Sequence, residues 1–292
     1  DNPGLEWCPP GHGDIYSALD ASGHLDALLA DGIEYAFISN SDNLGATPEP
    51  RILAHIERGR LPFLMEVTRR TAADRKGGHL ATNEDGRLVL RELAQCPEED
   101  IEAFQDIGRH RYFNTNNIWV HLGRLKEMLS EEGGALPLPF IRNEKTVDPK
   151  RADSQRVVQL ETAMGAAIGL FPGAAAIEVE RTRFAPVKKT SDLLALRSDA
   201  AEIRDDWTAG MVAERDGVPP EVTLSGHYKL LDDFERLIPA PPSLVACDAL
   251  ELDGEIELEP QTAFAGRVTV RADAPARLPA GSYADQSVSL PL

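Results

Sequence analysis

The amino-acid sequence predicts an α/β protein with a mostly parallel sheet covered on both faces, followed by a smaller β domain. Through the first two-thirds of the 292 residues, short apolar runs alternate with helical patterns, as they do in βα units. Near Val218-Pro219-Pro220 the pattern changes, and apolar residues beyond it recur at steps of six. At 42% hydrophobic residues, the chain can fill two cores. We therefore expect domains at 1–217 and 218–292.

The first predicted elements are a helix and a buried strand. Segment 15–30 carries four leucines on one helical face, and Asp31 and Gly32 end it. The apolar run 35–38 reads as a strand that ends in the polar cluster 39–43. Ligands of open α/β sheets collect at the carboxyl ends of strands, so this cluster is a candidate site.

The later elements of the first domain are inferred in the same way. A polar stretch at 113–117 interrupts the apolar pattern before an amphipathic helix that ends at Leu129. Strands are expected at 63–67, 88–93 and 174–179, and helices at 154–171 and from Leu193, where Ser191 and Asp192 supply the cap.

The second domain is identified by two interleaved series of apolar residues with glycine and proline between them. A period of six is typical of a β-helix, in which each rung points one apolar residue inward. An irregular antiparallel tail is the alternative. The two series are Leu252, Leu258, Phe264 and Val270, and Leu244, Leu250 and Ile256.

The charge balance limits the partners. Lys and Arg number 30 against 48 Asp and Glu, a formal charge of -18 that repels nucleic acid and anionic lipid. A phosphorylated small molecule remains compatible, because local cations or a divalent metal outweigh a distant surface charge. Three widely spaced cysteines and the lack of a long apolar stretch predict a cytoplasmic protein that does not bind membranes.

Polar segments that break the apolar pattern are the candidates for chemistry, and each also has an ordinary structural explanation. In 9–14, Gly11 allows close approach of a ligand and His12 supplies a donor, yet the segment also suits a turn with a helix cap. Asp42 suits Mg²⁺, which accepts one or two carboxylates and fills its other positions with phosphate and water; a cap is the alternative.

Three further segments follow the same reasoning. Gly77 and Gly78 could bring amides to a sugar or form a solvated hairpin. Asn114 and Asn116 alternate along an extended segment and would face one side, where they could bind hydroxyls or form a structural ladder. The basic run 181–189 suits phosphate, although such a run is usually a solvated face.

Taken in order, these segments resemble the UDP-glucose pyrophosphorylase family, that is, UTP:glucose-1-phosphate uridylyltransferase. The resemblance is close over about residues 1–210. It is carried by PPGHGDIY at 9–16, NSDNLGA at 40–46, RTAADRKGGHLA at 70–81, ELAQCP at 92–97, FNTNNIW at 113–119, QLETAMGAAI at 159–168 and RFAPVKKTSDLL at 183–194.

The resemblance implies a fold and a reaction. The fold would be a Rossmann-like, glycosyltransferase-A type nucleotidyltransferase domain followed by a left-handed parallel β-helix, through which copies of the chain could associate. A phosphate oxygen of glucose 1-phosphate would attack the α-phosphorus of UTP, giving UDP-glucose and pyrophosphate with Mg²⁺ as cofactor.

The resemblance also assigns expected roles to residues. Gly11 would lie at the uridine end of the nucleotide, Asp42 would hold the metal beside sugar and nucleotide, and Lys188 would be the catalytic lysine that neutralises the reacting phosphates. Sugar contacts are implied for His12, Asn40, Ser41, Asp42, Gly77, Gly78, Glu92, Asn114 and Asn116.

One family motif has no counterpart in these 292 residues. Members carry a loop of the form LxGGxGTxxG ahead of PPGHGD, whereas the Gly-Gly pairs here are 77–78 and 133–134, and neither precedes Gly-Thr. The sequence therefore predicts a clipped chain, a processed chain or an incomplete part of a longer one, without a complete triphosphate-binding site and with little activity expected of these residues alone. Two alternatives stay open: a pyrophosphorylase for another sugar, such as an N-acetylhexosamine or galactose, and a non-catalytic assembly module.

Overall fold

The computed structural model describes residues 7–71, 74–148, 151 and 153–291, and the chain divides into two compact units. Unit 1 comprises 1–40 and 48–181, and unit 2 comprises 41–47 and 182–292. The parallel strands of the tail begin at β11 (Glu221–Leu224), close to the expected boundary at 217/218. Compactness divides the chain earlier, because Leu194 and Ala200 belong to the core of the tail. The boundary at 217/218 stays a prediction.

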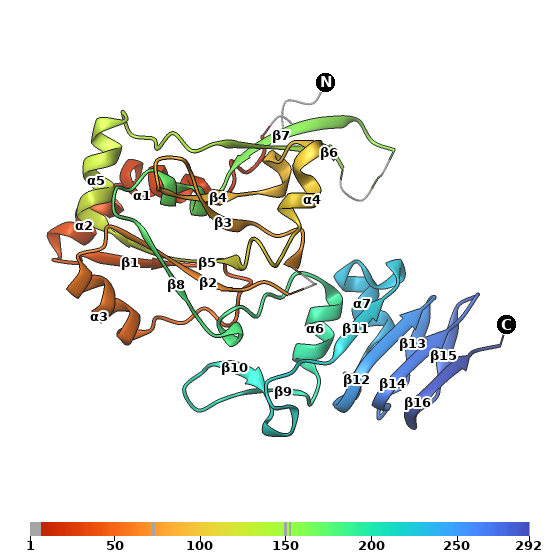
Figure 1. Ribbon diagram of the computed structural model, residues 1–292. Coiled ribbons are helices and arrows are strands. Elements are labelled where there is room, and N and C mark those ends of the chain that lie inside the picture. Colours follow the sequence, from red (N-terminus) through yellow and green to blue (C-terminus); the bar gives the residue numbers. More distant parts are fainter. Residues whose placement is uncertain (1–6, 72–73, 149–150, 152, 292) are drawn as a thin grey trace. The chain divides into compact units, whose positions relative to one another are not determined.

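Unit 1 is built on a six-stranded sheet (Figure 1). The strand order is β4-β3-β5-β2-β8, and β1 also pairs with β5. Its strands are β1 (Tyr35–Ile38), β2 (Phe63–Arg69), β3 (His79–Thr82), β4 (Leu88–Arg91), β5 (Tyr112–His121) and β8 (Ala175–Glu178).

The expectation of a mostly parallel sheet is wrong. In this sheet, β2 and β8 pair in parallel, while β5 is antiparallel to β1, β2 and β3, and β3 is antiparallel to β4. Both β1 and β2 run opposite to β5, so they share one direction, as a βα unit requires. The long strand β5 lies between them, and because it comes from much later in the chain, the local pattern contained no sign of it.

Helices cover both faces of this sheet, as predicted. The core of one face joins alternate residues of β2 and β5, including Phe63, Met65 and Ile118, to helices α1, α2 and α5. On the other face, α3 packs Ile52 and Ile56 on Leu64 and Trp119. The helices of unit 1 are α1 (Ile15–Ala21), α2 (His24–Ala30), α3 (Pro50–Gly59), α4 (Ile101–Phe104) and α5 (Leu122–Glu131).

The single helix expected at 15–30 is two helices. Gly23 adopts φ 76, a left-handed conformation that interrupts the helix between Ala21 and His24. Tyr16 of α1 and Leu25 of α2 are both fully buried, so the break lets each short helix turn its own apolar side inward. Strand β4 likewise ends at Arg91, before the expected end at Leu93, and a short 3-10 helix follows.

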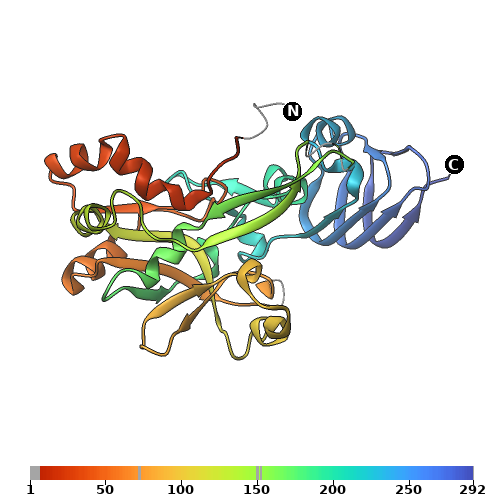
Figure 2. The ribbon, with the colours of Figure 1, turned by 90° about the horizontal axis from the view of Figure 1, so that it is seen from above.

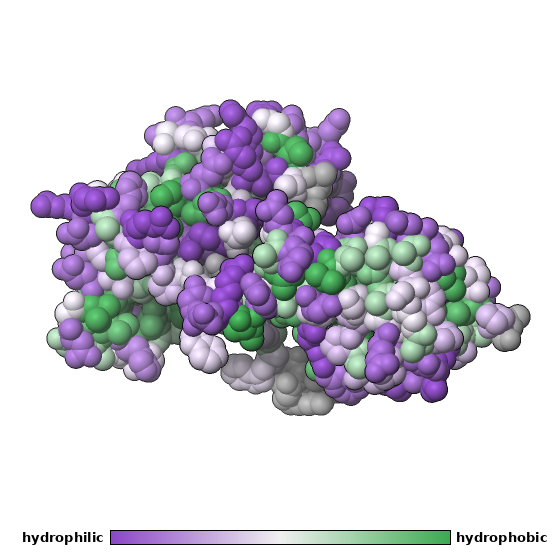
Figure 3. Space-filling model, turned by 90° about the horizontal axis from the view of Figure 1, so that it is seen from below, coloured by the Kyte–Doolittle hydropathy of each residue, from purple (hydrophilic) through white to green (hydrophobic). Residues whose placement is uncertain are grey.

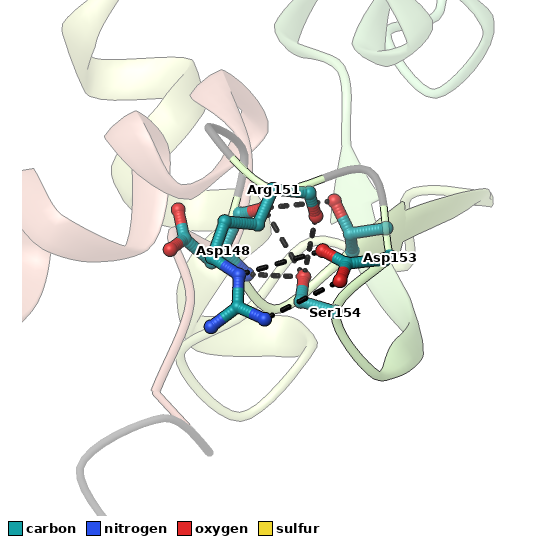
Figure 4. Close-up of polar contacts among 5 residues, drawn as sticks. Asp148, Arg151, Asp153 and Ser154 are labelled. Carbon is teal, nitrogen blue, oxygen red and sulfur yellow. Dashed lines mark hydrogen bonds and ion pairs between the residues drawn. The ribbon is translucent and has the colours of Figure 1, made fainter.

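The helix expected at 154–171 is wrong. Strand β7 (Arg156–Thr162) and a 3-10 helix (Met164–Gly169) occupy this segment, and β7 pairs antiparallel with β6 (Phe140–Thr146). The β-branched residues of Arg156–Thr162 favour an extended chain, and the distant β6 supplies its hydrogen bonds. At the tip of the hairpin, Ser154 Oγ accepts the Asp148 amide at 3.1 Å and lies 2.8 Å from the Arg151 carbonyl oxygen (Figure 4).

Unit 2 contains a sheet of four parallel strands in the order β11-β12-β14-β16, whose strands run side by side in Figure 2. A second parallel pair joins β13 to β15. Unit 2 also contains the helices α6 (Thr190–Arg197) and α7 (Leu231–Leu237) and the strands β9 (Ala201–Ile203) and β10 (Ala209–Met211). The further strands of the tail are β12 (Ser243–Asp253), β13 (Ile256–Leu258), β14 (Ala263–Arg271), β15 (Ala276–Leu278) and β16 (Ser282–Ser289).

All seven residues of the two predicted series are buried in the core of unit 2. Leu250 lies opposite Val268, and Val268 lies opposite Gln286, so each coil advances by 18 residues, or three steps of six. The alternative of an antiparallel tail is therefore wrong. Outside this core, polar side chains are spread over the face shown in Figure 3, with smaller apolar areas between them.

Helix α6 begins earlier than expected, at Thr190 instead of Leu193. Asp192 still stabilises its first turn, because its carboxylate accepts the amides of Lys188 and Lys189, each at 2.9 Å. No helix of the described residues is long and apolar enough to cross a membrane.

The buried series makes a stability prediction. Replacing the fully buried Leu252 by alanine leaves a cavity in unit 2 and should lower the free energy of unfolding by about 2 to 5 kcal/mol. Val218, which is 61% exposed, is the control, and Val218→Ala should change the free energy by less than about 0.5 kcal/mol. Urea unfolding followed by circular dichroism measures both. Equal losses would contradict the inward orientation of Leu252.

Candidate functional site

Gly11 and Gly13 bring the segment 9–13 into close contact with β7. The Thr162 amide donates to the Pro10 carbonyl at 2.8 Å. A Cβ on Gly11 would lie 2.4 Å from the Thr162 carbonyl oxygen, and one on Gly13 would lie 2.5 Å from its hydroxyl oxygen. Gly11 also has φ 87, a left-handed conformation. The turn expected for this segment is therefore present and packed on backbone, whereas the Asp14 side chain makes no capping hydrogen bond to the described residues of α1.

His12 is held by the start of the 3-10 helix that follows β7. Its Nδ1 accepts the Met164 amide at 3.0 Å. In the neutral imidazole, the proton therefore lies on Nε2, which is a donor. The ring is exposed, so a ligand oxygen can reach it.

Two glycines lie where side chains of β5 and of the segment after β4 come close. A Cβ on Gly77 would lie 2.0 Å from the Phe113 ring, and a Cβ on Gly78 would lie 2.4 Å from Glu92 Oε1. The Gly78 carbonyl accepts the Asn114 amide at 3.1 Å. The structure thus brings Gly77, Gly78, Glu92 and Asn114 together in unit 1.

Asn114 and Asn116 are hydrogen-bonded to each other. They do not alternate along a regular strand, so that expectation is wrong. Asn114 Nδ2 donates to Asn116 Oδ1 at 2.8 Å, and the Asn116 amide donates to Asn114 Oδ1 at 2.9 Å. Asn116 has φ 59, and the pairing of β5 with β2 shifts register here. The bulge turns two polar side chains toward each other, as bulges beside binding sites often do.

Glu66 is a buried residue that the sequence analysis did not identify. Its carboxylate accepts Trp119 Nε1 at 2.9 Å and Asn117 Nδ2 at 3.1 Å. Thr115 Oγ1 donates to its backbone carbonyl at 2.7 Å. These bonds hold β2 to β5 beside the bulge of Asn114 and Asn116. The MEVT sequence of β2, a carboxylate within an apolar run, was the available signal.

In unit 2, a short antiparallel contact holds Asp42 close to Lys188 along the backbone. The Val187 amide donates to the Asp42 carbonyl at 2.9 Å, and Asn43 forms a bridge with Pro186. The buried Asn43 side chain accepts the Ala185 amide at 2.8 Å and donates to the Arg183 carbonyl at 3.0 Å. Sequence analysis missed this role of Asn43, because these bonds join its side chain to backbone groups of another segment.

Asp42 is suited to a cation. Its Oδ1 is buried and has no hydrogen-bond partner among the described residues. An unpaired buried carboxylate oxygen is costly, so this atom is expected to have a ligand. Mg²⁺ fits, because it can be held by one carboxylate while phosphates and water complete its shell.

The remaining predicted residues lie at accessible positions. Asn40 follows β1 in unit 1 and is partly buried. Ser41 and Lys188 are exposed in unit 2, with Lys188 two residues before the start of α6. Each can meet a small molecule from solvent.

A family model described as UTP--glucose-1-phosphate uridylyltransferase matches residues 1–264. UTP--glucose-1-phosphate uridylyltransferase of Hordeum vulgare is 41% identical over 272 residues, which cover 93% of this chain and 56% of that protein. The Saccharomyces cerevisiae enzyme of the same name is 40% identical over 270 residues, covering 92% and 53%.

Solved structures give the same result. UDP-glucose phosphorylase of Trypanosoma brucei matches with a TM-score of 0.89 and 48% identity over 99% of this chain and 63% of that one. A mutant UDP-glucose pyrophosphorylase of Leishmania major, in complex with UDP-glucose, matches with a TM-score of 0.88 and 49% identity over 99% and 64%. The chain spans about half the length of the curated relatives that it matches.

The close packing of Gly11 can be tested against a glycine in open space. Gly23 has φ 76, and no described atom lies within 4 Å of a Cβ built on it, so Gly23→Ala should cost about 1 to 2 kcal/mol of unfolding free energy from backbone strain alone. Gly11→Ala adds a clash with backbone and should cost roughly 1 to 3 kcal/mol more. Urea unfolding of both variants decides; equal costs would contradict the contact of 9–13 with β7.

Proposed function

The chain belongs to the UTP--glucose-1-phosphate uridylyltransferase family, and on that premise we propose that it serves an enzyme that makes UDP-glucose. The substrates are UTP and glucose 1-phosphate, and pyrophosphate is the second product. One observation carries the proposal: in unit 2, the buried Asp42 Oδ1 has no hydrogen-bond partner in the part of the chain that the structure describes, and its segment pairs with the residues just before Lys188.

The reaction is a displacement at phosphorus. An oxygen of glucose 1-phosphate forms a bond to the α-phosphorus of UTP, and the bond to the bridging oxygen of pyrophosphate breaks. Two anions must meet, so positioning and charge neutralisation supply most of the acceleration. No proton has to be removed from the attacking phosphate, which is already ionised at neutral pH.

Lys188 is proposed as the catalytic residue. Its ammonium is a compact charge on a flexible stem, and it can follow the phosphates as charge shifts toward the leaving group. Asp192 fixes the backbone at this point by accepting the Lys188 amide. Asp42 is proposed to hold Mg²⁺, which when bound would neutralise charge on the phosphate oxygens.

The sugar is proposed to bind in unit 1, against Gly77, Gly78, Glu92 and the bulge of Asn114 and Asn116. Glycine backbone without side chains allows a ring to approach closely, while carboxylate and amide groups bind hydroxyls. Asn40 and Ser41 are proposed as further sugar contacts. His12, with its Nε2 donor, is proposed to contact the sugar nucleotide, and Gly11 to lie at the uridine.

Three finer points belong to the same proposal. The catalytic domain is a glycosyltransferase-A type fold, and the tail is a left-handed parallel β-helix, supported by its 18-residue coils. Copies of the chain associate through this tail, where β16 has a single strand neighbour among the described residues. The location is cytoplasmic, supported by the free thiols of Cys8, Cys96 and Cys247.

The substrate is tested by measuring pyrophosphate release from UTP by the enzyme in the presence of Mg²⁺ and one sugar 1-phosphate at a time. Glucose 1-phosphate should give the highest kcat/KM, and galactose 1-phosphate and N-acetylglucosamine 1-phosphate lower values. A preference for either of the other sugars would overturn the assignment of glucose. Release with none of the three would overturn the proposed activity.

Lys188→Ala should raise the barrier by about 2 to 4 kcal/mol, which is roughly 30- to 1,000-fold in kcat. The matched control is Lys189→Ala, which removes the neighbouring exposed lysine and should change kcat less than about threefold. Steady-state pyrophosphate release measures both variants. An unchanged kcat in Lys188→Ala would show that another group neutralises the phosphates.

Asp42→Asn keeps the shape of the side chain but removes its charge. The Mg²⁺ concentration for half-maximal activity should rise at least about tenfold, equivalent to roughly 1.4 kcal/mol. Asp205→Asn, at an exposed position of unit 2, is the control and should leave that concentration unchanged. If Asp42→Asn behaves like the control, Asp42 does not hold the metal.

A further inference from the structure

Arg70 is a buried arginine that the proposed function does not use. It lies directly after β2, and only 7% of the residue is exposed. Burial is unusual for arginine unless its donors are paired, because a desolvated charge is costly. The groups that pair with it therefore indicate what it stabilises.

Its guanidinium donates to four backbone carbonyls from three segments. Nη2 donates to Arg75 at 2.8 Å and to Asp74 at 3.2 Å. Nη1 donates to Phe104 at 3.1 Å and to His110 at 3.2 Å. The planar fork of arginine can meet several carbonyls at once, which the single ammonium of lysine cannot do in the same geometry. Arg70 thus ties the start of the Gly77-Gly78 turn to the end of α4 and to the segment before β5.

Among the described residues, the side chain that accepts a hydrogen bond from Arg70 is that of His79, and not a carboxylate. Nη1 lies 3.3 Å from His79 Nδ1. Both Nη1 hydrogens also point to carbonyls, so this longer contact shares one of them, with Nδ1 as the acceptor because arginine only donates. A neutral His79 with its proton on Nε2 satisfies this contact, and Nε2 itself then has no hydrogen-bond partner among the described residues. Burial, followed by the charges of His110, Arg70 and Arg91, lowers the pKa of His79 to about 3, in agreement with a neutral ring.

The carboxylate of Asp74 is engaged elsewhere. It accepts Arg181 Nη1 at 2.8 Å and Nη2 at 3.0 Å, and the amide of Thr71 at 2.9 Å. Burial raises the pKa of Asp74, but these hydrogen bonds and the Arg181 charge outweigh it and hold the pKa below its usual value. Arg70 is left to act on the backbone carbonyl of Asp74 and not on its side chain.

That carbonyl connects Arg70 to the glycines. The Asp74 carbonyl oxygen also accepts the Gly77 amide at 2.9 Å, so Arg70 and Gly77 share one acceptor. At the far end of the turn, the Gly78 carbonyl accepts the Asn114 amide at 3.1 Å. The turn is therefore fixed by Arg70 at its start and by β5 at its end.

We propose that Arg70 is a positioning residue for the hexose site: by holding the carbonyls of Asp74 and Arg75, it sets the Gly77-Gly78 backbone against Glu92 and Asn114. This inference rests on the proposed function for the identity of the ligand. It predicts that loss of Arg70 weakens recognition of the hexose part of UDP-glucose and leaves recognition of UDP almost unchanged.

The test compares Arg70→Met, Arg70→Lys and a matched control, Arg91→Met. Arg91 also lies over the Phe104 ring, at 5.6 Å against 5.8 Å for Arg70, and it contacts the Cys96 sulfur at 4.0 Å. Hydrogen exchange is measured by mass spectrometry on peptides covering 74–80 and on peptides of β2 and β5. Titration calorimetry gives the affinities for UDP-glucose and for UDP.

In Arg70→Met, we expect hydrogen exchange in 74–80 to rise at least about tenfold while exchange in β2 and β5 changes little. The reason is that the Asp74 carbonyl, which accepts from both Arg70 and Gly77, loses its bond to Arg70. The UDP-glucose affinity should fall at least about tenfold and the UDP affinity less than twofold. Arg70→Lys, which keeps the charge and part of the donor set, should lie between Arg70→Met and the unmodified protein. Arg91→Met should match the unmodified protein.

Equal losses of affinity for UDP-glucose and UDP, or exchange that rises equally across β2, β5 and 74–80, would show a purely structural role and overturn the proposal. If Arg70→Met does not fold, the same two comparisons on Arg70→Lys decide. If the unmodified protein binds UDP-glucose no better than UDP, the proposed hexose site fails. The exchange in 74–80 then still decides whether Arg70 fixes the turn.

Discussion

A carboxylate buried in the middle of the sheet sets the register on which the candidate sugar side of unit 1 depends. Glu66 is fully buried, and it is retained at this position because Asn117 and Trp119 of β5 donate to it. A wrong register would leave a desolvated charge without donors, at a cost of several kcal/mol. Just beyond Glu66 the pairing of β2 and β5 shifts, which creates the bulge of Asn114 and Asn116. The position of that bulge thus follows from the register that Glu66 sets.

Short-range patterns predicted the parts of the fold that short-range forces determine. The strands at 35–38 and 63–67 form where expected, and the period of six correctly gave the buried residues of the tail, because each rung repeats the same backbone geometry. The antiparallel pairing in the sheet could not be predicted in this way, since β5 joins the sheet from a distant part of the chain. The segment 156–162 shows the same limit, because its partner β6 decides its conformation.

In the candidate site, too, the local sequence identifies some residues and misses others. Residues that would touch a ligand stand out in sequence, because glycines, amides and a lysine interrupt apolar patterns; their roles here stay predictions. Asn43 and Arg70 do not stand out, since their side chains act on backbone groups of other segments. Only the folded chain shows that the backbone of Asp42 is tied to Val187, or that a buried guanidinium supports the Gly77-Gly78 turn. Residues that organise a site are harder to recognise than residues that line it.

The coils of the tail have a consequence for how its length can vary. Since Leu252, Val270 and Val288 occupy equivalent places on successive coils and all pack in or against one core, a whole coil of 18 residues can be added or lost with the apolar side chains still facing inward. Insertion of a number that is not a multiple of six would instead turn the following rungs outward, unless the extra residues form a loop at a corner. Length in this region is therefore constrained to discrete steps, while the cross-section of the tail stays constant.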